Sequence, residues 1–126
     1  MIQTYSFKYY PPMPVLSVLL SFPDSDQWHG PHIGIVDSGA DYTIIPLSNL
    51  APIDPPSVGS ANLVSQWEDR REVTVYHLDI RIGNVVLQSV EVAGDPDSKE
   101  VILGRNVLND LMLCLNGPEV QLELVE

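Results

Sequence analysis

One carboxylate in the sequence directly follows a run of apolar residues and precedes a hydroxyl residue and a glycine. Ile35 and Val36 lead into Asp37, Ser38 and Gly39. Apolar β-branched residues favour a buried strand, which would carry the carboxylate of Asp37 into a place of low dielectric. The glycine lets the backbone turn sharply and approach a ligand or a second chain, and the serine can fix the loop through hydrogen bonds to the backbone. Taken alone, Asp-Ser-Gly is more often an ordinary turn than a catalytic loop.

A second string lies well downstream, where the apolar run Val101–Leu103 precedes Gly104, Arg105 and Asn106. A strand followed by glycine and then a helix is suited to pass closely behind a loop, because glycine lets two backbones approach each other. Asn106 is a good residue for the N-terminal cap of that helix. Arg105 can reach a carboxylate near Asp37.

Together the two strings resemble the retropepsins, the aspartic proteases of retroviruses and their cellular relatives. Residues 37–41 follow the Asp-Thr/Ser-Gly-Ala-Asp pattern of that family at every position, and residues 104–106 follow its downstream Gly-Arg-Asn string. The resemblance covers residues 15–126. It implies an aspartic endopeptidase that hydrolyses peptide bonds and uses no metal and no cofactor.

The resemblance also implies which residues form the site. The catalytic carboxylate is Asp37. The residues that support the active-site loop and the dimer are Ser38, Gly39 and Arg105, with the arginine paired to Asp41. The residues that bind an extended peptide substrate are Gly39, Ala40, Asp41 and Trp67.

A flap is the second element that the resemblance implies, a β-hairpin over the cleft whose tip falls within Leu63–Arg70. Retroviral flaps are rich in glycine, whereas this segment contains none. Trp67 is the residue of the segment that we expect to close over a substrate. The alternative is a tryptophan that is packed or exposed without such a role.

This chemistry requires two carboxylates in one site, one ionised and one protonated. The sequence holds no second Asp-Ser/Thr-Gly, and the Asp95–Ser98 segment lacks the glycine. The missing carboxylate must therefore come from a second copy across a two-fold axis, so we expect a homodimer. The resemblance implies that the terminal strands, around Gln3–Lys8 and Val120–Val125, interleave with their mates in the partner.

The amino-acid composition limits the kinds of partner that the protein is expected to bind. Six basic and seventeen acidic residues give the 126-residue chain a formal net charge of −11. Phosphate binding needs clustered Lys and Arg, so this balance argues against a nucleic-acid partner. No segment is long enough to span a membrane and the N-terminus does not resemble a signal peptide, so we expect a soluble, cytoplasmic protein. The one cysteine, Cys114, excludes an intrachain disulfide and lies in an apolar run, which predicts a buried thiol.

Eleven prolines and many short β-prone segments predict an all-β fold: a small closed barrel that acts as a two-fold dimer. We expect a single domain over residues 1–126, with a surface loop over Leu47–Pro56 and one short C-terminal helix over Asn106–Leu113. The expected strands are Thr4–Tyr10, Val15–Phe22, His32–Val36, Tyr42–Ile45, Val58–Val64, Glu72–Ile82, Val85–Val92, Val101–Leu103 and Glu119–Val125.

Two other functions fit the same residues. One is a dimeric module of this fold that recognises extended peptides without cutting them, which the unusual flap segment favours. The other is a structural β-domain with a chance Asp-Ser-Gly, which the downstream Gly104–Asn106 disfavours. An intact Asp37–Gly39 triplet favours the enzyme, because a pure binder would not need it.

Overall fold

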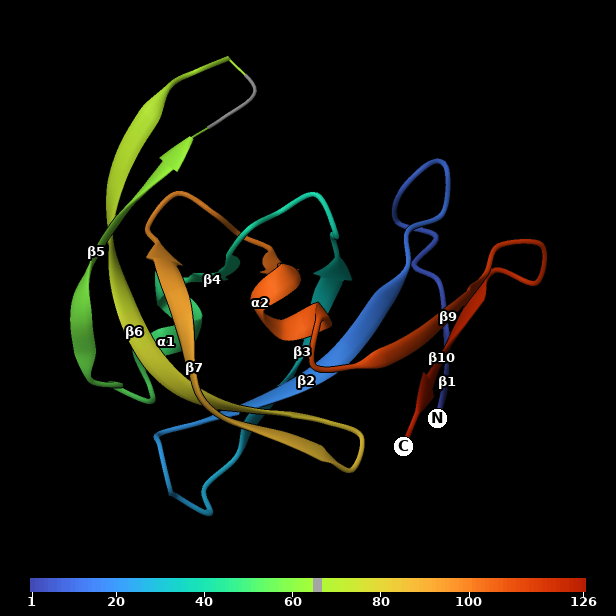
Figure 1. Ribbon diagram of the computed structural model, residues 1–126, viewed down its shortest axis with the longest axis horizontal. Coiled ribbons are helices and arrows are strands. Elements are labelled where there is room, and N and C mark those ends of the chain that lie inside the picture. Colours follow the sequence, from blue (N-terminus) through green and yellow to red (C-terminus); the bar gives the residue numbers. More distant parts are fainter. Residues whose placement is uncertain (65–66) are drawn as a thin grey trace.

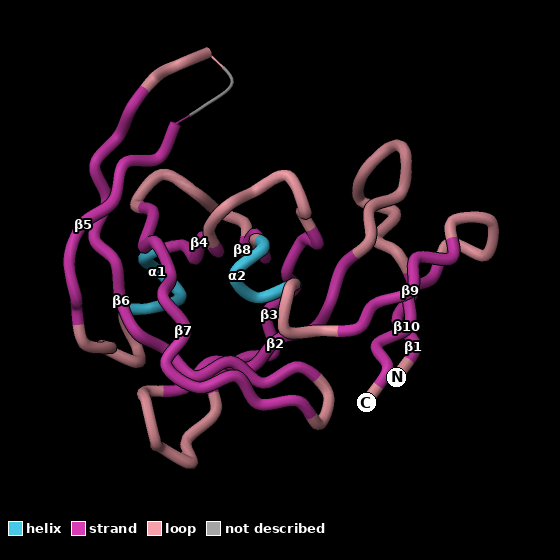
Figure 2. Tube along the Cα trace, viewed as in Figure 1, coloured by secondary structure: helices cyan, strands magenta, loops and turns pink. Residues whose placement is uncertain are grey.

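The computed structural model describes residues 1–64 and 67–126, and these residues fold mainly into β-strands (Figures 1 and 2). No helix among them is long and apolar enough to cross a membrane. The elements, in chain order, are β1 (Ile2–Thr4), β2 (Val15–Ser21), β3 (His29–Val36), β4 (Thr43–Pro46), α1 (Leu47–Leu50), β5 (Ser57–Val64), β6 (Arg70–Ile82), β7 (Val85–Asp95), β8 (Val101–Leu103), α2 (Arg105–Leu108), β9 (Met112–Asn116) and β10 (Gln121–Val125).

The larger sheet is a closed barrel. Its strands follow the order β2-β3-β8-β4-β7-β6-β5, and an additional pairing between β2 and β6 joins the ring. Closure leaves the six strands of the ring without a free edge. Strand β5 stands outside the ring and forms a long hairpin with β6 that projects from the barrel (Figure 1). This architecture confirms the predicted all-β barrel.

The barrel is filled by alternating apolar side chains. On β2 these are Leu16, Val18 and Leu20, and each is fully buried. Burying a side chain of this size stabilises the fold by about 1.5–3 kcal/mol. Helix α2 adds Val107 to the same cluster, and β10 adds Leu122. The core therefore ties the barrel, the helix and the terminal strands together.

Two parallel strands bring residues 37–41 and residues 104–106 to one place. Strands β3 and β8 run parallel, with Val36 opposite Leu103. Parallel strands present their carboxyl ends at the same edge of a sheet. Asp37 follows β3 and Gly104 follows β8, so the two strings meet at one end of the barrel.

The terminal strands form a second sheet in the order β1-β10-β9. Within it, Ile2 lies opposite Glu123 and Leu113 lies opposite Leu124. The first and last strands therefore pair within one chain, whereas the resemblance implied that each interleaves with a partner. Strands β1 and β9 form the two edges of this sheet.

The structure confirms most of the expected strands to within three residues at either end. The prediction for Thr4–Tyr10 was wrong beyond Thr4, where an irregular segment replaces the strand. The predicted surface loop Leu47–Pro56 begins with the one-turn helix α1.

The helix predicted over Asn106–Leu113 ends at Leu108, because β10 recruits the following residues into β9. Here tertiary pairing overrides a helical spacing of apolar residues. For the same reason the prediction of a buried thiol was wrong. Cys114 is exposed, because β9 lies on the surface.

An ion pair holds the β5–β6 hairpin near its tip, where Arg71 lies opposite Leu63. Arg71 of β6 donates from Nη1 and Nη2 to the carboxylate of Asp95, each at 2.8 Å, and from Nη1 to Asp97 at 2.8 Å. Asp95 is 4% exposed, whereas the side chain of Asp97 is 74% exposed. The bonds from Arg71 hold the pKa of the Asp95 carboxyl below its ordinary value, against the effect of burial.

This ion pair predicts a pH-dependent stability. A carboxyl whose pKa is lowered on folding contributes stability above its unfolded pKa and loses it as the pH falls through the folded value. Asp95→Asn should therefore lower the free energy of unfolding at neutral pH by about 1–3 kcal/mol, and the difference from wild type should shrink in acid. Urea unfolding between pH 7 and pH 3 measures it, with the exposed Asp97→Asn as the control, expected within about 0.5 kcal/mol. An equal effect of the two substitutions would contradict this account.

Candidate active site

Asp37 opens the loop between β3 and β4. Its N–H donates to the carbonyl of Leu103 on β8 at 3.1 Å, and its Oδ1 accepts from the N–H of Gly39 at 2.9 Å. Its carbonyl accepts from the N–H of Ala40 at 3.1 Å. The loop thus folds tightly around a half-buried carboxylate, while Ser38 and Gly39 are exposed.

Gly104 lies directly against the back of this loop. A Cβ atom at this position would lie 2.9 Å from the nitrogen of Tyr42 and still closer to its carbonyl group. The N–H of Gly104 donates to Thr43 Oγ1 at 3.1 Å. The structure confirms that the strand passes closely behind the loop, and it shows that only glycine fits there without a shift of the backbone.

Arg105 clamps the loop at three points. Its N–H donates to the carbonyl of Ala40 at 2.8 Å, and its Nη1 donates to the carbonyl of Ser38 at 2.8 Å. Its Nη2 donates to the carboxylate of Asp41, the pairing that the resemblance implied. The side chains of Arg105 and Asp41 are 44% and 83% exposed, so the pair adds little stability and acts mainly by fixing geometry.

Asn106 bonds to β4, the strand that follows the loop. Its predicted role as a helix cap was wrong, because the N-cap residue of α2 is Gly104 and no side chain of the described residues caps the helix. Its Oδ1 accepts from the N–H and the Oγ1 of Thr43 at 3.0 and 2.8 Å. Its Nδ2 donates to the carbonyl of Glu91 on β7 at 2.7 Å. Thr43, whose buried hydroxyl links Gly104 and Asn106, is a site residue that the sequence did not predict. Its only signal was a threonine that begins an apolar strand.

A cleft of about 290 Å³ separates the loop from the β5–β6 hairpin. Strand β5 lines one side with Ala61–Val64, and the loop lines the other with Gly39–Tyr42 and Ile44. The predicted substrate-binding residues Gly39, Ala40 and Asp41 therefore share one wall.

The remaining predicted site residue, Trp67, lies near the hairpin end and is 78% exposed. It is not among the residues that line the cleft in the described part of the chain. The predicted tip Leu63–Arg70 does fall between β5 and β6, and its residues Ser65 and Gln66 lie outside the described residues.

Among residues 1–64 and 67–126, no three His, Cys, Asp or Glu side chains are grouped as a metal site would require. The described loop combines one half-buried carboxylate with exposed main chain beside a cleft. Such an arrangement can bind an extended peptide through its backbone. Asp37 itself is not among the described residues that line the cleft and precedes the lining residue Gly39 by two positions.

Neither protein-family models nor curated proteins match this sequence. Solved structures do. The EIAV protease in complex with the inhibitor HBY-793 is 19% identical with a TM-score of 0.62, over 86% of this chain and 93% of that one. A retropepsin-like aspartic protease from Rickettsia conorii is 13% identical with a TM-score of 0.65, over 98% and 88%. The protease of simian foamy virus (mac) is 18% identical with a TM-score of 0.53, over 75% and 91%. The chain therefore has a retropepsin-like fold.

The contact behind the loop yields a prediction. Gly104→Ala should destabilise the protein by about 1–3 kcal/mol, because the new Cβ would overlap the backbone of Tyr42. Gly117→Ala is the matched control, since a Cβ there meets nothing within 4 Å. Urea titrations of the three proteins provide the comparison, and equal midpoints for the two variants would show that the close approach has been misjudged.

Proposed function

We propose that this protein is an aspartic endopeptidase of the retropepsin type, active as a homodimer in which two Asp37 carboxylates activate one water molecule. The observation that carries the proposal is the position of Asp37, on a loop beside the cleft, braced from behind by Gly104 and Arg105. A peptide-binding protein without catalysis does not require that carboxylate. The retropepsin-like fold of the solved structures above supports the same conclusion.

In this mechanism the two carboxylates share one proton, because two negative charges so close together repel each other. The ionised carboxylate takes a proton from water while the water oxygen attacks the peptide carbonyl carbon. The protonated carboxylate donates a hydrogen bond to the carbonyl oxygen. Transfer of a proton to the amide nitrogen then breaks the C–N bond and releases an amine and a carboxylic acid.

The substrate in this proposal is an extended peptide between the loop and the hairpin. Gly39, Ala40 and Asp41 offer it their main chain, and strand β5 covers it from the other side. The hairpin then acts as the flap, with Trp67 as the side chain that reaches the substrate. Arg105 supports the loop while both copies share the site, and Ser38 lies next to the two-fold axis.

The structure also suggests which surface joins the two copies. In the β1-β10-β9 sheet both β1 and β9 are open edges, and β9 is the longer, with five residues against three. An edge strand offers unpaired N–H and C=O groups to another chain. The five residues of β9 carry no charge, and Met112 and Leu115 are 67% and 55% exposed. In a chain of net charge −11, two copies meet with least repulsion on such a surface, so we place the dimer contact at β9 against β9.

The catalytic assignment has a direct test. Asp37→Asn should lower the cleavage of a peptide library on the order of 10³-fold or more, because it removes both carboxylates of the dimer while its shape is nearly unchanged. The exposed Asp26→Asn removes one negative charge elsewhere and should cleave like wild type. Mass spectrometry of the library reads out both. Cleavage by Asp37→Asn at the wild-type rate would leave the peptide-binding module as the better reading.

The dimer contact has a separate test. Leu115→Glu should weaken the dimer about 30-fold or more, since it introduces a charge at the centre of the contact. Val58→Glu is a matched control on β5, an edge strand of the larger sheet, where the valine is 47% exposed. Analytical ultracentrifugation measures the dimer, and circular dichroism establishes that both variants are folded. A Leu115→Glu protein that dimerises like wild type would exclude β9 as the contact.

A further inference from the structure

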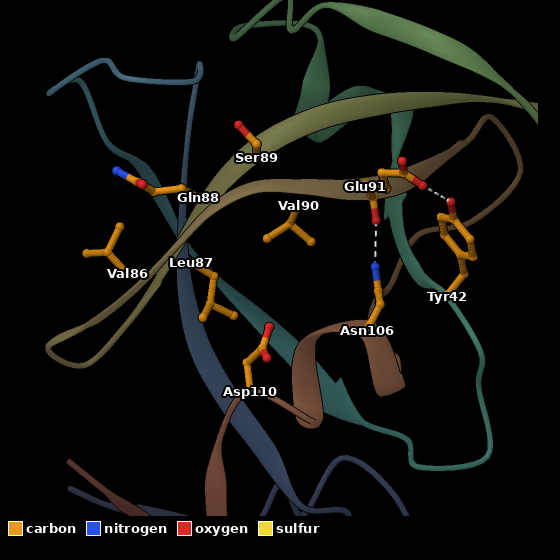
Figure 3. A pocket seen from close by; sticks show the side chains of 9 residues that line it. All are labelled: Tyr42, Val86, Leu87, Gln88, Ser89, Val90, Glu91, Asn106 and Asp110. Atoms are coloured by element: carbon orange, nitrogen blue, oxygen red, sulfur yellow. Dashed lines mark hydrogen bonds between the residues drawn. The ribbon is translucent and has the colours of Figure 1, made fainter.

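A second pocket, of about 500 Å³, lies on the outer side of the active-site loop (Figure 3). Its floor is apolar and comes from β7, where Val86 is 46% exposed and Val90 is 9% exposed. Glu91, at the end of this stretch of β7, and Asp110, just after helix α2, line it with carboxylates. In Figure 3 the side chain of Val90 lies between these two acidic residues.

The charged residues that line this pocket are both acidic. The hydroxyl of Tyr42 donates to the carboxylate of Glu91, and Nδ2 of Asn106 donates to the main-chain carbonyl of the same residue. These two donors are therefore engaged. A carboxylate has more lone pairs than the one that Tyr42 uses, so Glu91 can accept a further bond, and Asp110 supplies a second carboxylate for the donor of a ligand.

Glu91 keeps its negative charge in mildly acidic solution. The hydrogen bond from Tyr42 lowers the pKa of its carboxyl below the ordinary value, against desolvation, and His77 adds to the effect. The imidazole of His77 lies 3.7 Å from the carboxylate, on the neighbouring strand β6. An apolar floor between carboxylates suits a long cationic side chain, whose methylene groups cover the floor while its head binds the oxygens.

The pocket adjoins the cleft at one side chain. Tyr42 lines both hollows, next to Asp41 in the cleft and next to Glu91 in the pocket. A long side chain of a peptide that lies along the loop needs to pass only Tyr42 to reach the two carboxylates. Because the hollows adjoin and the pocket is acidic, a basic side chain of the substrate is the occupant that fits best.

We propose that the pocket is a substrate subsite for a lysine or arginine side chain, with Glu91 and Asp110 as its specificity-determining residues. The inference rests on the proposed function, because the side chain belongs to the peptide in the cleft. The net charge of −11 acts in the same direction, since it attracts cationic peptides.

Binding tests the subsite without any cleavage. Nα-acetyl-lysine methylamide, titrated into the wild-type protein, should shift the NMR signals of the Asn106 side-chain amide and bind about tenfold more tightly than Nα-acetyl-norleucine methylamide. The double variant Glu91→Gln/Asp110→Asn should abolish the difference between the two probes. Equal binding of the probes by wild type, or an unchanged preference in the double variant, would overturn the proposal.

Cleavage supplies a second arm that separates the two proposals. Wild type should favour Lys or Arg over norleucine about tenfold in kcat/KM at one fixed distance from the scissile bond. In the double variant this preference should vanish through a higher KM, with kcat retained. The control Asp26→Asn/Glu119→Gln removes two exposed charges elsewhere and should keep the preference. Cleavage without a preference for basic residues would contradict the subsite but not the protease. Absence of cleavage would contradict the protease, and the probe titration would then decide whether the pocket binds a basic side chain.

Discussion

Gly104 passes so close behind Tyr42 that a single methyl group would force the two segments apart, and the geometry of the candidate site depends on that contact. The approach is possible because β3 and β8 are parallel neighbours whose ends lie at the same edge of the barrel. Once the segments touch, Arg105 reaches the loop carbonyls and Asn106 reaches Thr43. A loop that would otherwise be an exposed turn is thereby held in one shape.

In the proposed function, a rigid loop with one carboxylate is half of a catalytic site. Asp37 is bonded to its own loop and to β8, so it has little freedom to move toward a substrate. Catalysis by a shared proton requires a second carboxylate at a fixed distance, and a symmetric partner supplies it without a second motif in the sequence. In the proposed dimer two strongly acidic chains meet at the uncharged edge of β9, so the surface chemistry and the reaction chemistry both favour the same assembly.

The sequence was most informative where a residue type has one physical use. Asp37 after a buried strand and Gly104 before a helix predicted both the site and the close approach of two distant segments. Prediction failed where tertiary pairing decided the outcome. Met112 lies at helical spacing from Leu108, yet β10 draws it into β9, and this exposes Cys114.

Contacts between residues far apart in the sequence explain the other features that the sequence did not predict. Asn106 looked like a cap because its partner Thr43 is far away in the sequence. The pocket beside Tyr42 combines β7, the end of α2 and the active-site loop, three segments whose meeting no local pattern indicates. The pairing of β1 with β10 inside one chain was equally invisible, since either strand could have paired with a partner's instead.

The central claim is that one site is built from Asp37 of two copies, and mixing the chains tests it most directly. Wild-type protein would be unfolded and refolded together with increasing shares of Asp37→Asn chains at constant total concentration, and peptide cleavage measured in each mixture. The account predicts that activity falls as the square of the wild-type fraction, because every mixed dimer lacks one carboxylate. Activity that stays proportional to the wild-type fraction would mean that each chain works alone, and would contradict the shared site.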